Sequence, residues 1–84
     1  MIRITFKLFA LLSDYLPAGH RGNAVSLEIA PGTTVMDLVE RYRLPPRLVH
    51  LVLINGVYFP PEQHATRQLA DGEVLAIWPP VAGG

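Results

Sequence analysis

The chain is organised around its last stretch, Val74-Leu75-Ala76-Ile77-Trp78-Pro79-Pro80-Val81-Ala82-Gly83-Gly84. Residues 74–78 form an apolar run typical of a strand. Two prolines stop this strand, because proline lacks the N–H that a sheet ladder needs. Pro79 also favours extended backbone at Trp78. We therefore expect a sheet that contains this strand, and a chain end that leaves the sheet stiffly instead of folding back onto it.

The four residues after the prolines are small and include two glycines. Fully extended, residues 81–84 reach about 13 Å. Gly83 and Gly84 have no Cβ, so this end can enter a channel that is too narrow for side chains. A stiff base, a thin tip and a carboxylate suit a terminus that is carried into another protein's active site. The alternative is a loose end without a function, as many chain ends are.

Composition narrows the classes of protein that need to be considered. With 84 residues, the chain is expected to form a single domain, residues 1–84, in which residues 79–84 are an extended tail. Seven basic and seven acidic residues cancel, which gives no support for a nucleic-acid partner. There is no cysteine, hence no disulfide framework and no thiolate metal site. No apolar run is long enough to cross a membrane, and we expect a cytoplasmic protein.

The first half of the chain predicts two strands, each followed by a helix. Apolar residues at every second position predict strands over 2–8 and 25–29. Helical spacing predicts a short helix over 9–16, ended by Pro17. Thr34 and Asp37 have the spacing of a capping box and begin the main helix, whose apolar stripe is Val35, Leu38, Val39 and Tyr42 and which Pro45-Pro46 ends.

The second half predicts a hairpin, a polar loop and the last strand. Residues 49–55 predict a third strand, and the tight-turn signal Asn55-Gly56 leads from it into a fourth strand over 57–59. Residues 62–68 are expected to form a loop before Leu69 anchors the chain. One main helix then covers one face of a mixed sheet of about five strands, which is an α+β class. The other face is left to solvent or to a partner.

Two strands are apolar on both faces, which is unexpected for a sheet covered on one side. In the strand predicted over 49–55, Leu51 and Leu53 have the opposite parity to Val52 and Ile54. In the last strand, Ala76 and Trp78 similarly have the opposite parity to Leu75 and Ile77. One of the two parities must lie away from the helix. Such an apolar patch marks a binding surface, and tryptophan is a typical interface anchor. The alternative is that the loop over residues 62–68 covers this patch.

The segment from Leu69 to Gly84, with its Asp71-Gly72 turn, apolar strand, Pro-Pro-Val and terminal Gly-Gly, resembles the end of the ubiquitin-like sulfur-carrier proteins. This family includes the molybdopterin synthase small subunit and the thiamine-biosynthesis sulfur carrier. Residues 7–12, 31–35 and 53–56 are similar to its first strand and short helix, its main-helix start and its hairpin. The resemblance covers nearly the whole chain and implies a β-grasp (ubiquitin-like) fold.

The resemblance also implies a function, which we state as an expectation. An E1-like adenylating enzyme would use ATP to activate the Gly84 carboxylate, with Gly83 beside it, and a sulfur donor would convert it to a thiocarboxylate. A sulfur-accepting enzyme, such as the large subunit of molybdopterin synthase, would then take the sulfur. Partner contacts are expected at Leu51, Leu53 and Ala76 and along residues 78–82, namely Trp78, Pro79, Pro80, Val81 and Ala82. The chain would bind no cofactor and contribute no catalytic side chain.

Several alternatives remain open at this point. Sulfur could be destined for molybdopterin, our first choice, or for thiamine, transfer RNA or another acceptor. The chain could instead be a ubiquitin-like protein modifier or a non-catalytic binding module. His20, His50 and His64 are widely spaced and predict no metal site; each is interpreted as a surface or loop histidine. The arginines at 41, 43 and 47 are interpreted as a solvated helix end, with docking of an acidic partner as the second interpretation.

Overall fold

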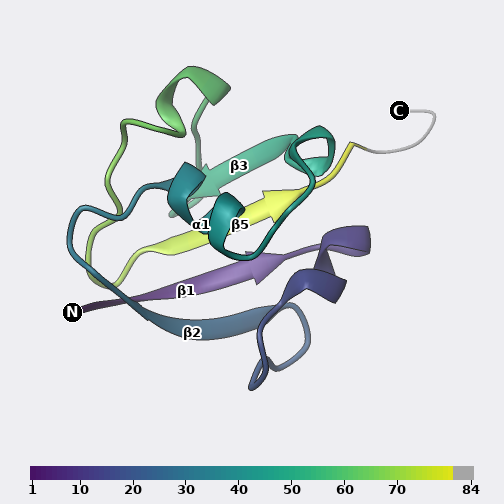
Figure 1. Cartoon of the computed structure of the whole chain (residues 1–84), viewed down its shortest axis with the longest axis horizontal. Coiled ribbons are helices and arrows are strands. Elements are labelled where there is room, and N and C mark those ends of the chain that lie inside the picture. Colours follow the sequence, from purple (N-terminus) through teal and green to yellow (C-terminus); the bar gives the residue numbers. More distant parts are fainter. Residues whose placement is uncertain (81–84) are drawn as a thin grey trace.

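The computed structural model describes residues 1–80 and consists of a five-stranded sheet with one α-helix on one face (Figure 1). The order across the sheet is β2-β1-β5-β3-β4. This mixed sheet confirms the expected α+β class and β-grasp architecture. The strands are β1 (Ile2–Leu8), β2 (Ala24–Ile29), β3 (Leu51–Ile54), β4 (Val57–Tyr58) and β5 (Val74–Trp78).

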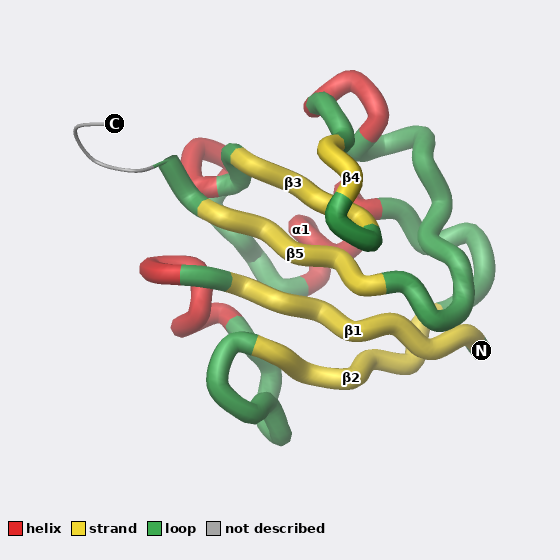
Figure 2. The backbone as a smooth tube through the Cα atoms, turned by 180° about the vertical axis from the view of Figure 1, so that it is seen from behind, coloured by secondary structure: helices red, strands yellow, loops and turns green. Residues whose placement is uncertain are grey.

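The last strand, β5, occupies the middle of the sheet. It pairs with β1 in parallel, with Phe6 opposite Leu75, and with β3 in the antiparallel sense, with Val52 opposite Ile77. β2 pairs with the outer side of β1, and β4 with the outer side of β3. Seen from behind, the sheet lies in front of α1, and no helix of residues 1–80 crosses this second face (Figure 2).

The helical segments are shorter than the sequence pattern suggests. α1 (Val35–Arg41) begins with the predicted capping box: Asp37 N–H donates to Thr34 Oγ1 and Thr34 N–H to Asp37 Oδ2. The segment after β1 is a 3-10 helix, η1 (Ala10–Tyr15). Two further 3-10 turns are η2 (Pro46–Leu48) and η3 (Pro61–Gln63). α1 ends before Pro45-Pro46, because Arg43 adopts a left-handed φ of 56°.

One parity of β1, β2, β3 and β5 forms the core with α1, whereas both residues of β4 are exposed. Phe6 and Leu8 of β1 and Leu75 and Ile77 of β5 are fully buried. α1 contributes Val35, Leu38 and Val39, and η1 contributes Leu12. The β3–β4 turn confirms the Asn-Gly signal, since Asn55 and Gly56 both have positive φ, 52° and 79°, as a type I′ turn requires.

The long connection between β4 and β5 is held by an ion pair. The Arg67 guanidinium donates two hydrogen bonds to the Glu73 carboxylate, at 2.7 and 2.6 Å, and lies 5.1 Å from the centre of the Phe59 ring. Glu73 also accepts a bond from Ala70 N–H. The hydrogen bonds from Arg67 lower the pKa of Glu73, and partial burial opposes this shift only in part. The ionised pair therefore stabilises the segment between Arg67 and Glu73, which directly precedes β5.

Replacing this carboxylate should weaken the fold in a pH-dependent manner. We expect Glu73→Gln to lower the free energy of unfolding by about 1–2 kcal/mol at neutral pH, because Arg67 loses its charged acceptor. The pKa of Glu73 in the folded protein lies below the value of about 4.3 in the unfolded chain. The stability difference between the wild type and Glu73→Gln is therefore fully present above about pH 4.3, and it disappears as the pH falls through the folded pKa.

Urea unfolding across a pH series measures this difference. The control is Glu62→Gln, which removes an exposed carboxylate in η3, and it should change stability by less than about 0.5 kcal/mol. Equal losses in both variants, or a Glu73→Gln loss that does not depend on pH, would contradict the role assigned to the pair.

Candidate functional site

The base of the C-terminal tail is held on both sides. Phe9 N–H donates to Ile77 O at 3.2 Å, and His50 N–H donates to Trp78 O at 3.1 Å. Beyond these bonds, Pro79 and Pro80 have no N–H to continue a ladder. Pro79 is buried and Pro80 is exposed, so the change from body to solvent falls between the two prolines. The predicted site residues Val81, Ala82, Gly83 and Gly84 lie outside the described residues.

Trp78 is fixed in place by an aromatic partner. Its ring stacks on Phe9 with a centroid distance of 4.2 Å and parallel planes. Stacked aromatic pairs contribute about 0.5–1.5 kcal/mol beyond their buried area. Phe9 was assigned to a helical stripe by the sequence pattern, but it precedes η1 with extended backbone. The stack therefore brings together the end of β1 and the end of β5 at the point where the tail begins.

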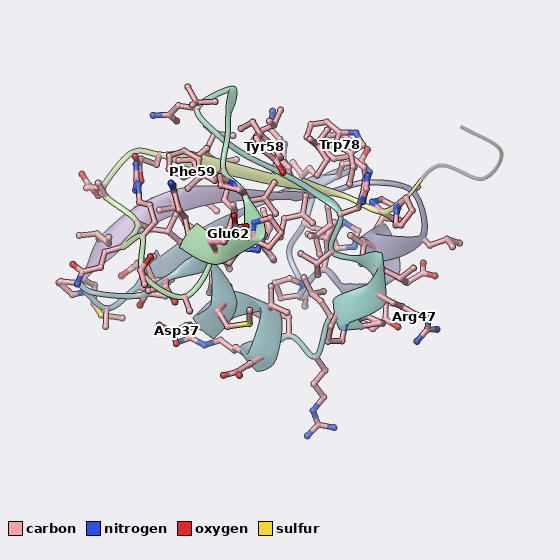
Figure 3. The ribbon with its side chains drawn as sticks, turned by 90° about the horizontal axis from the view of Figure 1, so that it is seen from above. Asp37, Arg47, Tyr58, Phe59, Glu62 and Trp78 are labelled. Atoms are coloured by element: carbon pink, nitrogen blue, oxygen red, sulfur yellow. The ribbon has the colours of Figure 1, made fainter. Side chains whose placement is uncertain are left out.

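The structure places the four predicted sheet residues on one surface. The strand register sets Leu51 opposite Trp78 and Leu53 opposite Ala76, on the parity that faces away from α1. Figure 3 shows Tyr58 and Trp78 on the side of the sheet opposite Asp37 of α1. We call this surface the open apolar face and define it as Phe9, Leu51, Leu53, Tyr58, Val74, Ala76 and Trp78. Ala76 is only 6% exposed and forms its floor, whereas Leu51 is 36% exposed.

Tyr58 belongs to the open apolar face but was not among the predicted residues. It is 53% exposed and lies opposite Leu53 in the β3–β4 register. The Asn55-Gly56 turn contains the signal that could have identified it, since a two-residue turn sets Leu53 opposite Tyr58. The large exposed area of Tyr58 makes it a candidate contact residue at the far edge of the face.

The loop after β4 does not cover the open apolar face. Met36 N–H of α1 donates to His64 O at 2.8 Å, and Thr34 forms a bridge with Gln68. These contacts attach residues 62–68 to the helix side of the sheet. The sequence left two alternatives for these apolar residues, a binding surface or coverage by the loop over residues 62–68. The structure disfavours coverage by the loop.

One of the three histidines is not at the surface. His64 lies in the loop after β4, as one of the two interpretations had it, but it is buried there: it is only 4% exposed, and its Nε2 lies 3.0 Å from Phe59 O. Its burial follows from the attachment of the loop to α1. His20 and His50 are exposed, as are the three arginines at 41, 43 and 47. Within residues 1–80, no three His, Asp or Glu side chains are grouped as a metal site would require.

None of the helices in the described part of the chain is long and apolar enough to span a bilayer.

Comparison with known proteins identifies relatives of the whole domain. The model of the Mut7-C ubiquitin family matches residues 1–83. Among solved structures, SAMP1 from Haloferax volcanii is 29% identical with a TM-score of 0.65, covering 98% of this chain and 99% of its own. The Haloferax volcanii HVO 2177 protein is 23% identical with a TM-score of 0.75, covering 99% and 87%.

A third similar structure is a Pyrococcus furiosus protein assigned as molybdopterin converting factor, subunit 1. It is 24% identical with a TM-score of 0.64, and the alignment covers 96% of this chain and 100% of that protein. None of the curated proteins matches the chain.

The Phe9–Trp78 stack can be tested by fluorescence, because Trp78 is the only tryptophan in the chain. We expect Phe9→Ala to shift the emission of Trp78 to longer wavelength, since one face of the indole becomes exposed to water. Leu11→Ala, at a 67% exposed position in η1, is the control and should leave the spectrum unchanged. An unchanged spectrum in Phe9→Ala would show that the stack does not shield Trp78.

Proposed function

Because this chain belongs to the Mut7-C ubiquitin family, we propose that it is a sulfur carrier that presents its own C-terminal carboxylate to partner enzymes. The observation that best supports this function is the way the chain leaves the sheet. The central strand ends beside an open apolar face, and beyond its last backbone hydrogen bonds the chain passes from the buried Pro79 to the exposed Pro80. The general carrier role agrees with the ubiquitin-like relatives; the chemistry at Gly84 is our proposal.

The proposed reaction starts from the poor reactivity of a carboxylate. An E1-like enzyme joins the Gly84 carboxylate to AMP from ATP and releases pyrophosphate. A sulfide or persulfide sulfur then attacks the acyl carbon, and AMP leaves with the C–O bonding electrons. With a persulfide donor, a thiol must next cleave the S–S bond of the acyl disulfide. The product is a Gly84 thiocarboxylate, from which a second enzyme takes sulfur, and the carboxylate returns on hydrolysis.

The folded part of the protein would position the C-terminal carboxylate and would take no part in the chemical steps. A partner that covers the open apolar face holds Trp78 and therefore the base of the tail. The carboxylate then stays near the partner's active site, so its reaction becomes effectively intramolecular. Since the chain has no cysteine, the persulfide must come from another protein or from a small molecule.

The first pathway we propose is molybdopterin synthesis, with the large subunit of a molybdopterin synthase or an equivalent protein as the sulfur acceptor. The assignment of the Pyrococcus furiosus neighbour agrees with this choice. The alternatives are that the carried sulfur serves thiamine synthesis, transfer RNA thiolation or another pathway. A protein modifier would use the same activated carboxylate, but would transfer it to a lysine amine.

Intact-mass spectrometry tests the carrier function directly. The full chain is incubated with ATP, an E1-like enzyme from the same genome and a sulfur donor. We expect one oxygen to be replaced by sulfur, and we expect a variant lacking Gly84 to show no change. Conjugates with lysines would favour the modifier function. An unchanged mass with every adenylating enzyme of the genome, together with partner binding that survives loss of Gly83 and Gly84, would favour a binding module.

The open apolar face can be tested in the same assay. We expect Leu51→Arg to raise the KM for the chain in adenylation by about tenfold or more, because a charge is placed where apolar contacts form, with little change in kcat. Leu11→Arg introduces the same charge at a more exposed position outside this face and is the matched control. Equal effects of the two substitutions would argue against docking through this face.

A further inference from the structure

The side of the sheet that faces away from α1 has a second, polar half. β1 and β2 present Thr5 and Ser26 on this side, directly opposite each other in the register. An open pocket of about 340 Å³ lies against them, lined by Thr5, Gly19, Arg21, Ala24, Val25 and Ser26. The η1–β2 loop that forms its outer wall lies at the end of the sheet where β5 ends (Figures 1 and 2), since Leu8 N–H donates to Asn23 O and Leu8 pairs with Ile77.

The backbone holds the wall of this pocket in place. Arg21 and Ala24 exchange two backbone hydrogen bonds, at 2.8 and 3.1 Å, around a turn in which Gly22 has a φ of 57°. The next residue, Asn23, fastens the loop to β1: its Nδ2 donates to Leu8 O at 2.8 Å, and its carbonyl accepts from Leu8 N–H at 3.0 Å. Arg21 is therefore presented to the pocket from a fixed backbone.

The groups around the pocket donate hydrogen bonds and lack an acceptor from the protein. Within residues 1–80, the ion pairs are those of Arg3 with Glu28 and of Arg67 with Glu73, so Arg21 and the neighbouring Lys7 have none. Glu28, two residues beyond Ser26, is engaged by Arg3 at 2.8 Å. Over the same range, the Thr5 and Ser26 hydroxyls make no side-chain hydrogen bond. Arg21 and the two hydroxyls that line the pocket, with Lys7 two residues from Thr5 on β1, favour an anion.

We propose that this pocket receives an aspartate or glutamate side chain of the enzyme that covers the open apolar face, an inference that rests on the proposed carrier function. The charge of the pocket selects a carboxylate, with Arg21 as its main partner and the Thr5 and Ser26 hydroxyls as further donors. The pocket lies beside the open apolar face, so a protein bound to that face is the source of this carboxylate. Thr5 lies opposite Val74 and Lys7 opposite Ala76, so the pocket is continuous with the open apolar face.

The two halves together would set the direction in which the carrier lies on its partner. The open apolar face alone gives affinity but few directional contacts. A charged contact on one side of it disfavours the reversed orientation, in which Arg21 would meet apolar surface. The orientation decides whether the end of β5 points toward the partner's active site. Arg21 is therefore a positioning residue, and it takes no part in the reaction.

The test uses the full chain and the E1-like enzyme, with ATP–pyrophosphate exchange as the readout. We expect Arg21→Glu to raise the KM for the chain by about fivefold or more at low salt, with kcat little changed and a smaller effect at high salt. Arg41→Glu makes the same charge change at an exposed position of α1, on the other side of the sheet, and should leave the KM unchanged. Replacing one acidic residue of the enzyme by arginine should restore the KM of Arg21→Glu.

The outcomes separate this inference from the function on which it rests. Suppose that the wild-type chain supports exchange but Arg21→Glu and Arg41→Glu have equal KM values. The proposed role of the pocket is then refuted, and the carrier function is not affected. No exchange with the wild-type chain overturns both. Inorganic phosphate is the probe for a free anion: if it shifts the amide resonances of Thr5 and Ser26 in the isolated chain and competes with the enzyme, the pocket is a small-anion site and a partner carboxylate is excluded.

Discussion

The pairing of β5 on both of its edges is the constraint on which the rest of the structure depends. Bonds from Phe9 and His50 secure the two sides of its last residues, and the prolines begin where these bonds stop. Displacing the base of the tail would break a parallel and an antiparallel ladder at once. The residues that precede the tail are therefore bonded on both edges of β5 up to Trp78.

The single α-helix determines which surface remains for partners. α1 covers one face of the sheet, and residues 62–68 are bonded to the same side through Met36 and Thr34. The opposite face keeps an apolar half around Trp78 and a polar half around Thr5 and Ser26. An apolar area supplies contact energy, and fixed donors supply direction. The apolar half reaches the end of β5 at Trp78, whereas the polar half lies beside the start of β5, since Thr5 pairs with Val74 and with Ser26.

Local patterns predicted most of the elements, and contacts distant in sequence account for what they missed. Period-two alternation identified β1 and β2 and grouped Leu51 with Leu53 and Ala76 with Trp78, because parity is a property of each strand alone. The β3–β5 register then places both pairs on one face. The capping box and the Asn-Gly turn are likewise local. The Phe9–Trp78 stack, the burial of His64 and the pocket beside Arg21 each depend on how loops and strand ends meet, which periodicity does not encode. The early end of α1 reflects the backbone at Arg43, for which no local signal was present.

The parallel pairing of β1 with β5 joins segments from opposite ends of the sequence, with a consequence during synthesis. A nascent chain cannot complete its sheet until β5 has left the ribosome, and contacts of such long range form slowly because a large loop must close first. Until then Phe6 and Leu8 have no strand on one side and the core stays open. A chain that ends before β5 would therefore lack both the complete sheet and the C-terminal residues that partners would bind. Because β5 is the last strand of the chain, an incomplete chain could not act as a carrier.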